Sequence, residues 1–135
     1  MTPSWRPTVW AVPTWPAEQG NLIESVNSMS WKEYYKQHLM TAEEAVNHIK
    51  SGDRVVVAHA CGEPSYLLDV MVSNAKAYKN VEIVHMVAMG KGEYCKPEYA
   101  ENFRHNAFFV GGSTRDAIAE GRGDFTPSFF FEVPA

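Results

Sequence analysis

The sequence is poor in cysteine, in basic charge and in long apolar runs. Its two cysteines, Cys61 and Cys95, allow at most one disulfide bond and form no CxxC pair, which excludes a disulfide-stabilised scaffold. The net charge of −4, without any basic block, argues against nucleic acid or an anionic membrane as a partner. No apolar run approaches the ~20 residues that span a bilayer, and the N-terminus lacks the pattern of a signal peptide. We therefore expect a cytoplasmic protein with reduced thiols.

Signatures of metal, nucleotide and serine-hydrolase chemistry are also missing. The five histidines show no HxxxH spacing, and neither a GxSxG nor a GxGxxG motif occurs. Lys91 lies between two glycines but is not followed by Ser or Thr, as a phosphate-binding P-loop requires. We therefore expect no bound metal and interpret residues 90–92 as a flexible loop.

The composition is that of a globular domain, with a different N-terminal segment. Apolar residues make up 45% and charged residues 21% of the chain. Residues 1–28 hold four of the eight prolines and three of the four tryptophans. Because proline at this density disfavours helices and inner strands, we expect residues 1–28 to be a disordered or extraneous extension of a domain at 29–135. The alternative is an aromatic interaction motif built on the evenly spaced tryptophans.

From Trp31 onward the sequence alternates between helical and strand patterns. Thr41 and Glu44 form a capping box, and the apolar spacing that follows predicts a helix up to Gly52. The β-branched run at 54–58 predicts a strand buried on both faces. The other expected elements are a helix at 31–38, a helix from Pro64 to Tyr78, strands at 81–87 and 103–110, and a short helix capped by Ser113. This alternation predicts an α/β fold with an open, mostly parallel sheet and flanking helices.

Three segments that follow predicted strands share one edge of the sheet. Ligands of open α/β sheets bind beyond the carboxyl ends of the strands, and His59 with its following turn lies there. The loop at 90–92 follows the next strand, and in the segment 111–115 the glycines and Arg115 suit a carboxylate or a phosphate. Ordinary turns and a packed His85 are the structural alternatives, and a Cys61–His59 nucleophile pair is a further, less favoured one.

From Met29 onward the chain resembles the N-terminal part of the acetyl-CoA hydrolase/transferase family. The resemblance is greatest to its 4-hydroxybutyrate and butyryl-CoA:acetate CoA-transferase branch. It covers residues 29–135 almost completely, which is more specific than any single motif. The matching stretches include 31–35, 41–46, 49–55, Ala58-His59, Glu63-Pro64, 74–81, His85-Met86, 90–94, 96–99, 113–115, 118–121 and 130–134.

The resemblance implies an acyl-CoA:carboxylate CoA-transferase with a CoA-transferase/NagB-like sheet. A glutamate nucleophile would attack the acyl-CoA thioester and carry CoA as a glutamyl thioester to a short-chain carboxylate. In the family that glutamate belongs to the C-terminal half, so we expect no catalytic residue in this chain and no activity from it alone. The implied partners are acyl-CoA, the carboxylate and the missing C-terminal half, in a homo-oligomer when full-length.

The resemblance also implies which residues face the substrate. His59 matches an active-site histidine of the family and would form a hydrogen bond with the acyl group or acid. The expected cleft residues are His59, Ala60, Cys61, Gly62, Glu63, Pro64, Met89, Gly90, Lys91, Gly92, Ser113, Thr114 and Arg115. A non-catalytic truncated product or partner-binding domain is the alternative, and a binder of a phosphorylated small molecule is a weaker one.

Overall fold

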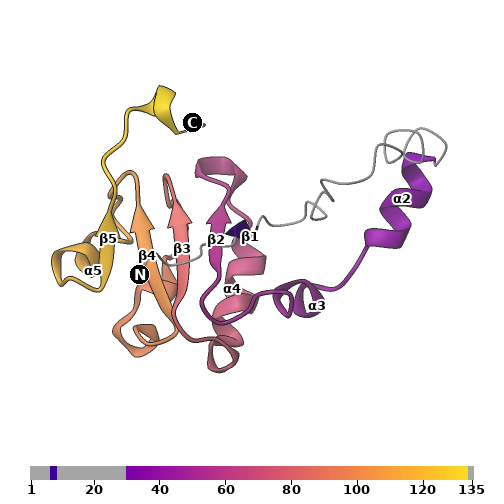
Figure 1. The fold of residues 1–135 in the computed structure, drawn as a ribbon, viewed down its shortest axis with the longest axis horizontal. Coiled ribbons are helices and arrows are strands. Elements are labelled where there is room, and N and C mark those ends of the chain that lie inside the picture. Colours follow the sequence, from indigo (N-terminus) through magenta and orange to yellow (C-terminus); the bar gives the residue numbers. More distant parts are fainter. Residues whose placement is uncertain (1–6, 9–29, 134–135) are drawn as a thin grey trace, which may run out of the picture.

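A parallel sheet forms the centre of the molecule. The computed structural model describes residues 7–8 and 30–133. The strands lie side by side in chain order and all adjacent pairs are parallel (Figure 1). They are β1 (Pro7–Thr8), β2 (Arg54–Val57), β3 (Val81–His85), β4 (Phe103–Ala107) and β5 (Gly123–Phe125). The predicted α/β class with a parallel sheet and flanking helices is confirmed.

Helices and 3-10 turns connect the strands. The α-helices are α2 (Trp31–His38), α3 (Ala42–Val46), α4 (Ser65–Ser73) and α5 (Arg115–Ala119). The 3-10 turns are η1 (Ala60–Gly62), η2 (Ala75–Ala77), η3 (Glu93–Cys95), η4 (Pro97–Tyr99) and η5 (Phe130–Glu132). The parallel register requires each connection to cross over, so the carboxyl ends of β2 to β5 all lie at one edge.

One face of the sheet is buried under the core. Side chains alternate along a strand, and in β3 the residues Val81, Ile83 and His85 are buried while their neighbours are half-buried. The core also takes in Val46, Ile49, Val55, Val57, Leu68, Met71, Val72, Ala75, Tyr78, Tyr94 and Phe103. Fully burying each large apolar side chain stabilises the fold by about 1.5–3 kcal/mol.

The opposite face is more open than the sequence predicts. Residues 54–58 were expected to form a strand buried on both faces, but Val56 is 48% exposed. The same face carries a row of polar partners, in which Glu82 on β3 accepts hydrogen bonds from Arg54 on β2 and Asn106 on β4. A continuous β-branched run therefore did not mark two buried faces, because the neighbouring strands present polar side chains on one of them.

The helices are shorter than predicted. The expected capping box of α3 is present, with Thr41 accepting from the Glu44 N–H, but the α-helix ends at Val46 and one 3-10 turn carries the chain on to Ile49. The helix expected from Pro64 to Tyr78 splits into α4 and η2. Its interruption coincides with Ser73, whose hydroxyl donates to a carbonyl within the last turn of α4.

The structure also corrects the predicted buried face of α4, the predicted N-cap of α5 and the predicted ends of two strands. In α4 the buried residues are Leu68, Met71 and Val72, whereas Leu67 of the predicted apolar face is half-buried. The N-cap of α5 is Thr114 and not Ser113, and its side chain makes no capping bond. The strands predicted at 81–87 and 103–110 end at 85 and 107, and strand β5 was not predicted.

The N-terminal segment enters the sheet at one point. Pro7 and Thr8 pair with Arg54 and Val55 at the edge of the sheet, the position at which a strand tolerates proline. The rest of the expected extension 1–28, including its tryptophan motif, lies outside the described residues.

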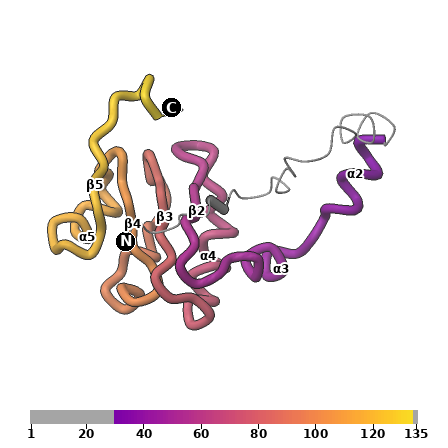
Figure 2. Tube along the Cα trace, in the orientation of Figure 1, coloured from indigo at the N-terminus to yellow at the C-terminus, as the bar shows by residue number. Residues whose placement is uncertain are grey.

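Two segments stand away from the core. Helix α2 lies apart from the sheet (Figure 1). It has the predicted bounds and a Ser30–Glu33 capping box, but none of its residues is buried. After β5 the chain runs past the carboxyl edge of the sheet and ends in η5 (Figure 2). No helix in residues 30–133 is long and apolar enough to cross a membrane.

Candidate functional site

The segments after β2, β3 and β4 meet at the carboxyl edge of the sheet, as predicted. The Ala60 N–H donates to the Val87 carbonyl at 3.0 Å, which joins the first segment to the second. The Phe109 N–H donates to the Met86 carbonyl at 3.0 Å, which joins the third to the second. The candidate residues at this edge therefore come from neighbouring loops that are tied by their backbones.

Glycines allow these loops to approach closely. Gly92 has a φ of +61°, and a Cβ there would lie 2.9 Å from the Ser113 carbonyl oxygen. A Cβ on Gly111 would lie 3.2 Å from the Ala88 carbonyl oxygen. The close approach explains why a side chain is excluded at Gly92.

Glu63 links the turn after β2 to the loop after β3. Its side chain is 5% exposed, and Oε2 accepts hydrogen bonds from the N–H groups of Met89 and Gly90, both at 2.9 Å. The same oxygen lies 3.7 Å from Nε2 of His85. The carboxylate predicted to face the substrate is thus already bound to the protein.

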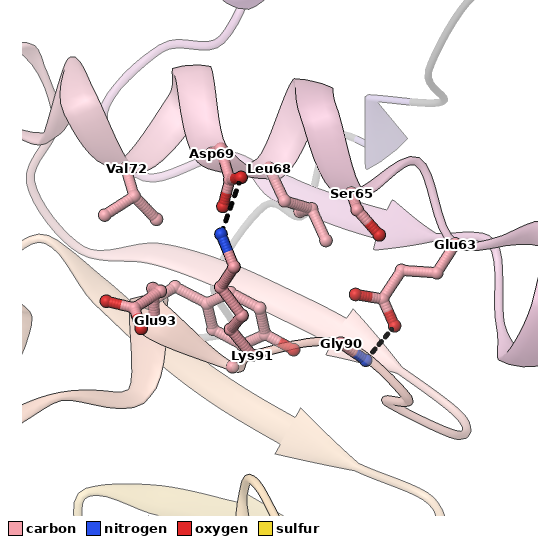
Figure 3. Close-up of a pocket in the computed structure, with 10 residues that line it drawn as sticks. Glu63, Ser65, Leu68, Asp69, Val72, Gly90, Lys91 and Glu93 are labelled. Carbon is pink, nitrogen blue, oxygen red and sulfur yellow. Dashed lines mark hydrogen bonds and ion pairs between the residues drawn. The ribbon is translucent and has the colours of Figure 1, made fainter.

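A cavity of about 230 Å³ opens between α4 and the loop after β3 (Figure 3). Leu68, Val72 and Tyr94 give it apolar walls, and Figure 3 shows Ser65, Leu68, Asp69 and Val72 on the α4 side. Lys91 reaches across and forms an ion pair with Asp69, at 3.0 Å between Nζ and Oδ2. The cavity therefore combines apolar walls with one ammonium group, which is already paired, and with the carboxylates of Glu63, Asp69 and Glu93.

The candidate residues divide between this cavity and the outer edge. Glu63, Gly90, Lys91 and Gly92 line the cavity. His59 and Cys61 are exposed outside it, and Cys61 is a free thiol. The other predicted cleft residues also lie outside the cavity lining: Ala60, Gly62, Pro64, Met89, Ser113, Thr114 and Arg115.

The turn that carries His59 has an unusual backbone. Ala60 has a φ of +52°, in the left-handed region that non-glycine residues seldom adopt. Such strain is stabilised by the surrounding structure and concentrates at functional sites. Thr114, in contrast, is fully buried, which leaves Ser113 and Arg115 as the exposed members of the third segment.

Two buried histidines lie behind the cavity wall. Nδ1 of His85 is 3.0 Å from the Tyr94 hydroxyl, and the Tyr94 ring packs against His105 with centroids 5.5 Å apart. Burial and the neighbouring His85 lower the pKa of His105 to about 4. Burial lowers the pKa of His85 as well, against the opposing pull of Glu63. Both rings are therefore neutral at pH 7, and the expectation that His85 is a packed core residue is confirmed.

Burial also raises the pKa of two other titratable groups near the site, so that both stay protonated at neutral pH. It raises the pKa of the Cys95 thiol to about 12, despite Arg122 nearby, so this cysteine is not a nucleophile at neutral pH. It raises the pKa of the Tyr94 hydroxyl far above its usual range. Among the described residues no group of three or more His, Cys, Asp or Glu side chains could hold a metal ion.

Sequence reasoning missed the α4 side of the site. Ser65, Leu68, Asp69 and Val72 face the cavity, but their spacing reads as an ordinary amphipathic helix. Tyr94 was equally inconspicuous, because it lies within a polar loop, and the match of residues 90–94 to the family did not mark it as part of a cavity wall. Nothing in the sequence alone indicates that these side chains face Lys91.

Comparisons with known proteins agree on one family of CoA-transferring enzymes. Residues 23–135 match the family model described as the acetyl-CoA hydrolase/transferase N-terminal domain. The chain is 58% identical over 107 residues to the 4-hydroxybutyrate coenzyme A transferase of Clostridium kluyveri. The aligned region covers 79% of this chain and 25% of that relative. It is 32% identical over 107 residues to the butyryl-CoA:acetate CoA-transferase of Anaerostipes caccae, covering 78% and 24%.

The fold has a counterpart among solved structures. RipA from Yersinia pestis superposes with a TM-score of 0.70 at 24% identity, over 78% of this chain and 27% of that one. The chain spans about a quarter of the length of the curated relatives it matches.

Proposed function

The chain belongs to the acetyl-CoA hydrolase/transferase family, and on that premise we propose that it acts as the N-terminal part of an acyl-CoA:carboxylate CoA-transferase. The observation that carries the proposal is the identity to the 4-hydroxybutyrate coenzyme A transferase along most of the described domain. Coenzyme A enters as acyl-CoA, and the acceptor is a short-chain carboxylate of the acetate, butyrate or 4-hydroxybutyrate type.

The proposed reaction runs through a glutamate outside this chain. Its carboxylate attacks the thioester carbonyl and displaces the CoA thiolate, which leaves an acyl-glutamyl anhydride. The thiolate then attacks the glutamyl carbonyl, which releases the first carboxylate and forms a glutamyl-CoA thioester. The acceptor carboxylate repeats both steps in reverse. The chain alone is then inactive, and the remaining portion of the enzyme is its partner, in a homo-oligomer.

The residues of this chain bind and orient the substrates in that scheme. His59 stands exposed at the carboxyl edge, where an imidazole can form a hydrogen bond with the acyl group or the acid. The cavity offers apolar walls for a short acyl chain, and Lys91, paired with Asp69, is the one cation among its lining residues beside three carboxylates. Ser113 and Arg115 complete the edge as exposed donors, and Arg115 supplies a second cation for an anionic group.

A chimera tests the proposal. Residues 29–135 replace the matching N-terminal segment of the Clostridium kluyveri relative, and CoA transfer from acetyl-CoA to 4-hydroxybutyrate is measured. We expect transfer by the chimera, none by the 135-residue chain, and a loss of about ten- to hundredfold in kcat/KM for His59→Ala. Lys76→Ala, on the exposed side of η2, serves as the surface control. A folded chimera without transfer contradicts the proposal, and unchanged rates in His59→Ala contradict the role of that residue.

A partner-binding domain without catalysis is the second candidate. One observation favours it: large apolar side chains are exposed along the carboxyl edge, among them Met89 at 71% and Phe109 at 62%. The chimera separates the two, because a purely partner-binding domain confers no transfer activity. The cytoplasmic location expected from the sequence stays a prediction.

A further inference from the structure

The Glu63 carboxylate is committed to the protein backbone. It leaves the turn after β2 and accepts two N–H groups, of Met89 and Gly90, from the loop after β3. With 5% of its side chain exposed, it has little surface left for a ligand. Hydrogen bonds to an ionised acceptor are stronger than neutral ones, so this contact is a firm tie between two loops.

Gly90 is shaped to receive this carboxylate. A Cβ at Gly90 would lie 2.1 Å from Oε1 of Glu63, so the carboxylate packs directly on the glycine Cα. The position therefore excludes every other residue as long as Glu63 keeps its place (Figure 3). Two independent features, the paired N–H donors and the missing Cβ, describe the same contact.

A buried row of side chains lies behind Glu63. His85 presents Nε2 to the carboxylate at 3.7 Å and Nδ1 to the Tyr94 hydroxyl at 3.0 Å. Tyr94 in turn forms part of the cavity wall beside Lys91. The row therefore connects the loop after β3 to the wall of the cavity that the loop borders.

We propose that Glu63 is a positioning residue of the candidate site and not a ligand of the substrate. Its carboxylate, backed by His85, fixes the backbone of Met89 and Gly90, and this fixed backbone sets Lys91 opposite Asp69 at the cavity. The importance of that placement for CoA transfer rests on the proposed function. The tie itself does not, and it is measurable in the 135-residue chain.

Amide hydrogen exchange followed by NMR on the full 135-residue chain tests the tie. In the wild type we expect the N–H groups of Met89 and Gly90 to be protected, although Met89 is exposed. Glu63→Ala speeds their exchange roughly ten- to hundredfold and moves both proton shifts upfield. Glu63→Gln keeps an oxygen acceptor without the charge and restores part of the protection. Glu98 is an exposed glutamate on η4, and Glu98→Ala, the control, leaves the exchange rates of both amides unchanged.

A second variant approaches the contact from the other side. Gly90→Ala displaces the carboxylate while Glu63 is present, and it releases the same amides. If Glu63→Ala lost amide protection throughout the chain, that variant would report unfolding and not the local contact. The exchange rates of Met89 and Gly90 in Glu63→Gln and Gly90→Ala would then decide whether Glu63 holds the loop. Wild-type exchange rates at Met89 and Gly90 in Glu63→Ala and in Gly90→Ala overturn the proposal.

Measuring CoA transfer by Glu63 variants of the chimera distinguishes a failure of this proposal from a failure of the proposed function. In an active chimera, Glu63→Ala lowers kcat/KM about tenfold or more, and Glu63→Gln recovers part of the loss. An active chimera that is indifferent to Glu63→Ala overturns the positioning role. An inactive chimera contradicts the proposed function, while the amide exchange still decides whether Glu63 holds the loop.

Discussion

At the residue scale, the buried histidines are the least ordinary feature of the core. Within the described part of the chain, neither ring nitrogen of His105 nor Nε2 of His85 meets a partner at good hydrogen-bond geometry, although the backbone groups of Ile83 and Ala58 lie near enough to oppose the lowering of the pKa values of His105 and His85. Buried polar atoms without partners are costly, so these rings are tolerated only as neutral groups. The core therefore depends on a protonation state that neutral pH supplies and acid removes.

The first prediction concerns this dependence on pH. The pKa of His105 is about 4 in the fold and about 6.5 in an unfolded chain. The unfolded state therefore binds more protons in this window, so the free energy of unfolding falls as the pH drops from about 6.5 towards 4. His105 alone accounts for about 3 kcal/mol of the fall.

Urea unfolding at several pH values measures this effect. His105→Phe keeps a ring against Tyr94 but cannot titrate, and we expect it to remove a large part of the pH dependence, with His85 supplying the remainder. An identical slope in the wild type and in His105→Phe would refute the assignment.

The second prediction concerns the glycine that lets two loops meet. Gly92→Ala places a methyl group 2.9 Å from the Ser113 carbonyl oxygen at a residue with φ of +61°. We expect a loss of about 1–3 kcal/mol in the free energy of unfolding. Gly112→Ala is the matched control, since a Cβ there meets nothing within 4 Å. Equal stabilities of the two variants would argue against the close approach.

At the element scale, polar side chains join the strands across the open face of the sheet. Glu82 on β3 bonds to Arg54 on β2 at 2.6 Å and to Asn106 on β4 at 2.8 Å. Arg104 on β4 pairs with Asp124 on β5, where both side chains are about half exposed. Cross-strand pairs of this kind stabilise neighbouring strands, and the degree of burial decides by how much.

The third prediction compares these two groups of contacts. Glu82, whose side chain is 16% exposed, serves two strands at once, so Glu82→Ala leaves two partners to rearrange and costs about 1–3 kcal/mol. Asp124→Ala breaks a water-exposed pair and costs less than about 1 kcal/mol. Urea unfolding of the two variants side by side provides the comparison, and a larger loss in Asp124→Ala would contradict the ranking.

At the scale of the whole molecule, apolar side chains gather where the loops end. Each of β2 to β5 leads to an exposed apolar residue at or after its carboxyl end: Tyr66, Met89, Phe109 and Phe125. The final segment adds Phe129, Phe130 and Phe131, which are 70–78% exposed. Large apolar side chains exposed in such numbers promote association.

The fourth prediction follows from this surface. We expect the 135-residue chain to self-associate, because association removes the exposed phenylalanines from water. Sedimentation velocity over a range of concentrations measures it. Replacing Phe129, Phe130 and Phe131 together by Ser shifts the chain towards monomer. A monomeric wild type at high concentration would contradict the prediction.

The sequence by itself determined the class of the fold, the order of helices α2 to α5 and of the inner strands β2 to β4, and the family. Capping signals and apolar periodicity are local, and they act over a few residues, so Thr41 with Glu44 and the strand at Val81 were predictable from neighbouring letters alone. The convergence of three loops at one edge followed as well, since parallel strands place all their carboxyl ends together.

The tertiary structure decided what those residues do. Local pattern could not reveal that Glu63 faces the backbone of Gly90, that Asp69 meets Lys91, or that one face of β2 lies open. Each of these depends on side chains that come from elements some twenty or more residues apart, and only the packing of those elements fixes their distances. Glu63, which the sequence predicts to face the substrate, accepts hydrogen bonds in the fold from the backbone of Met89 and Gly90.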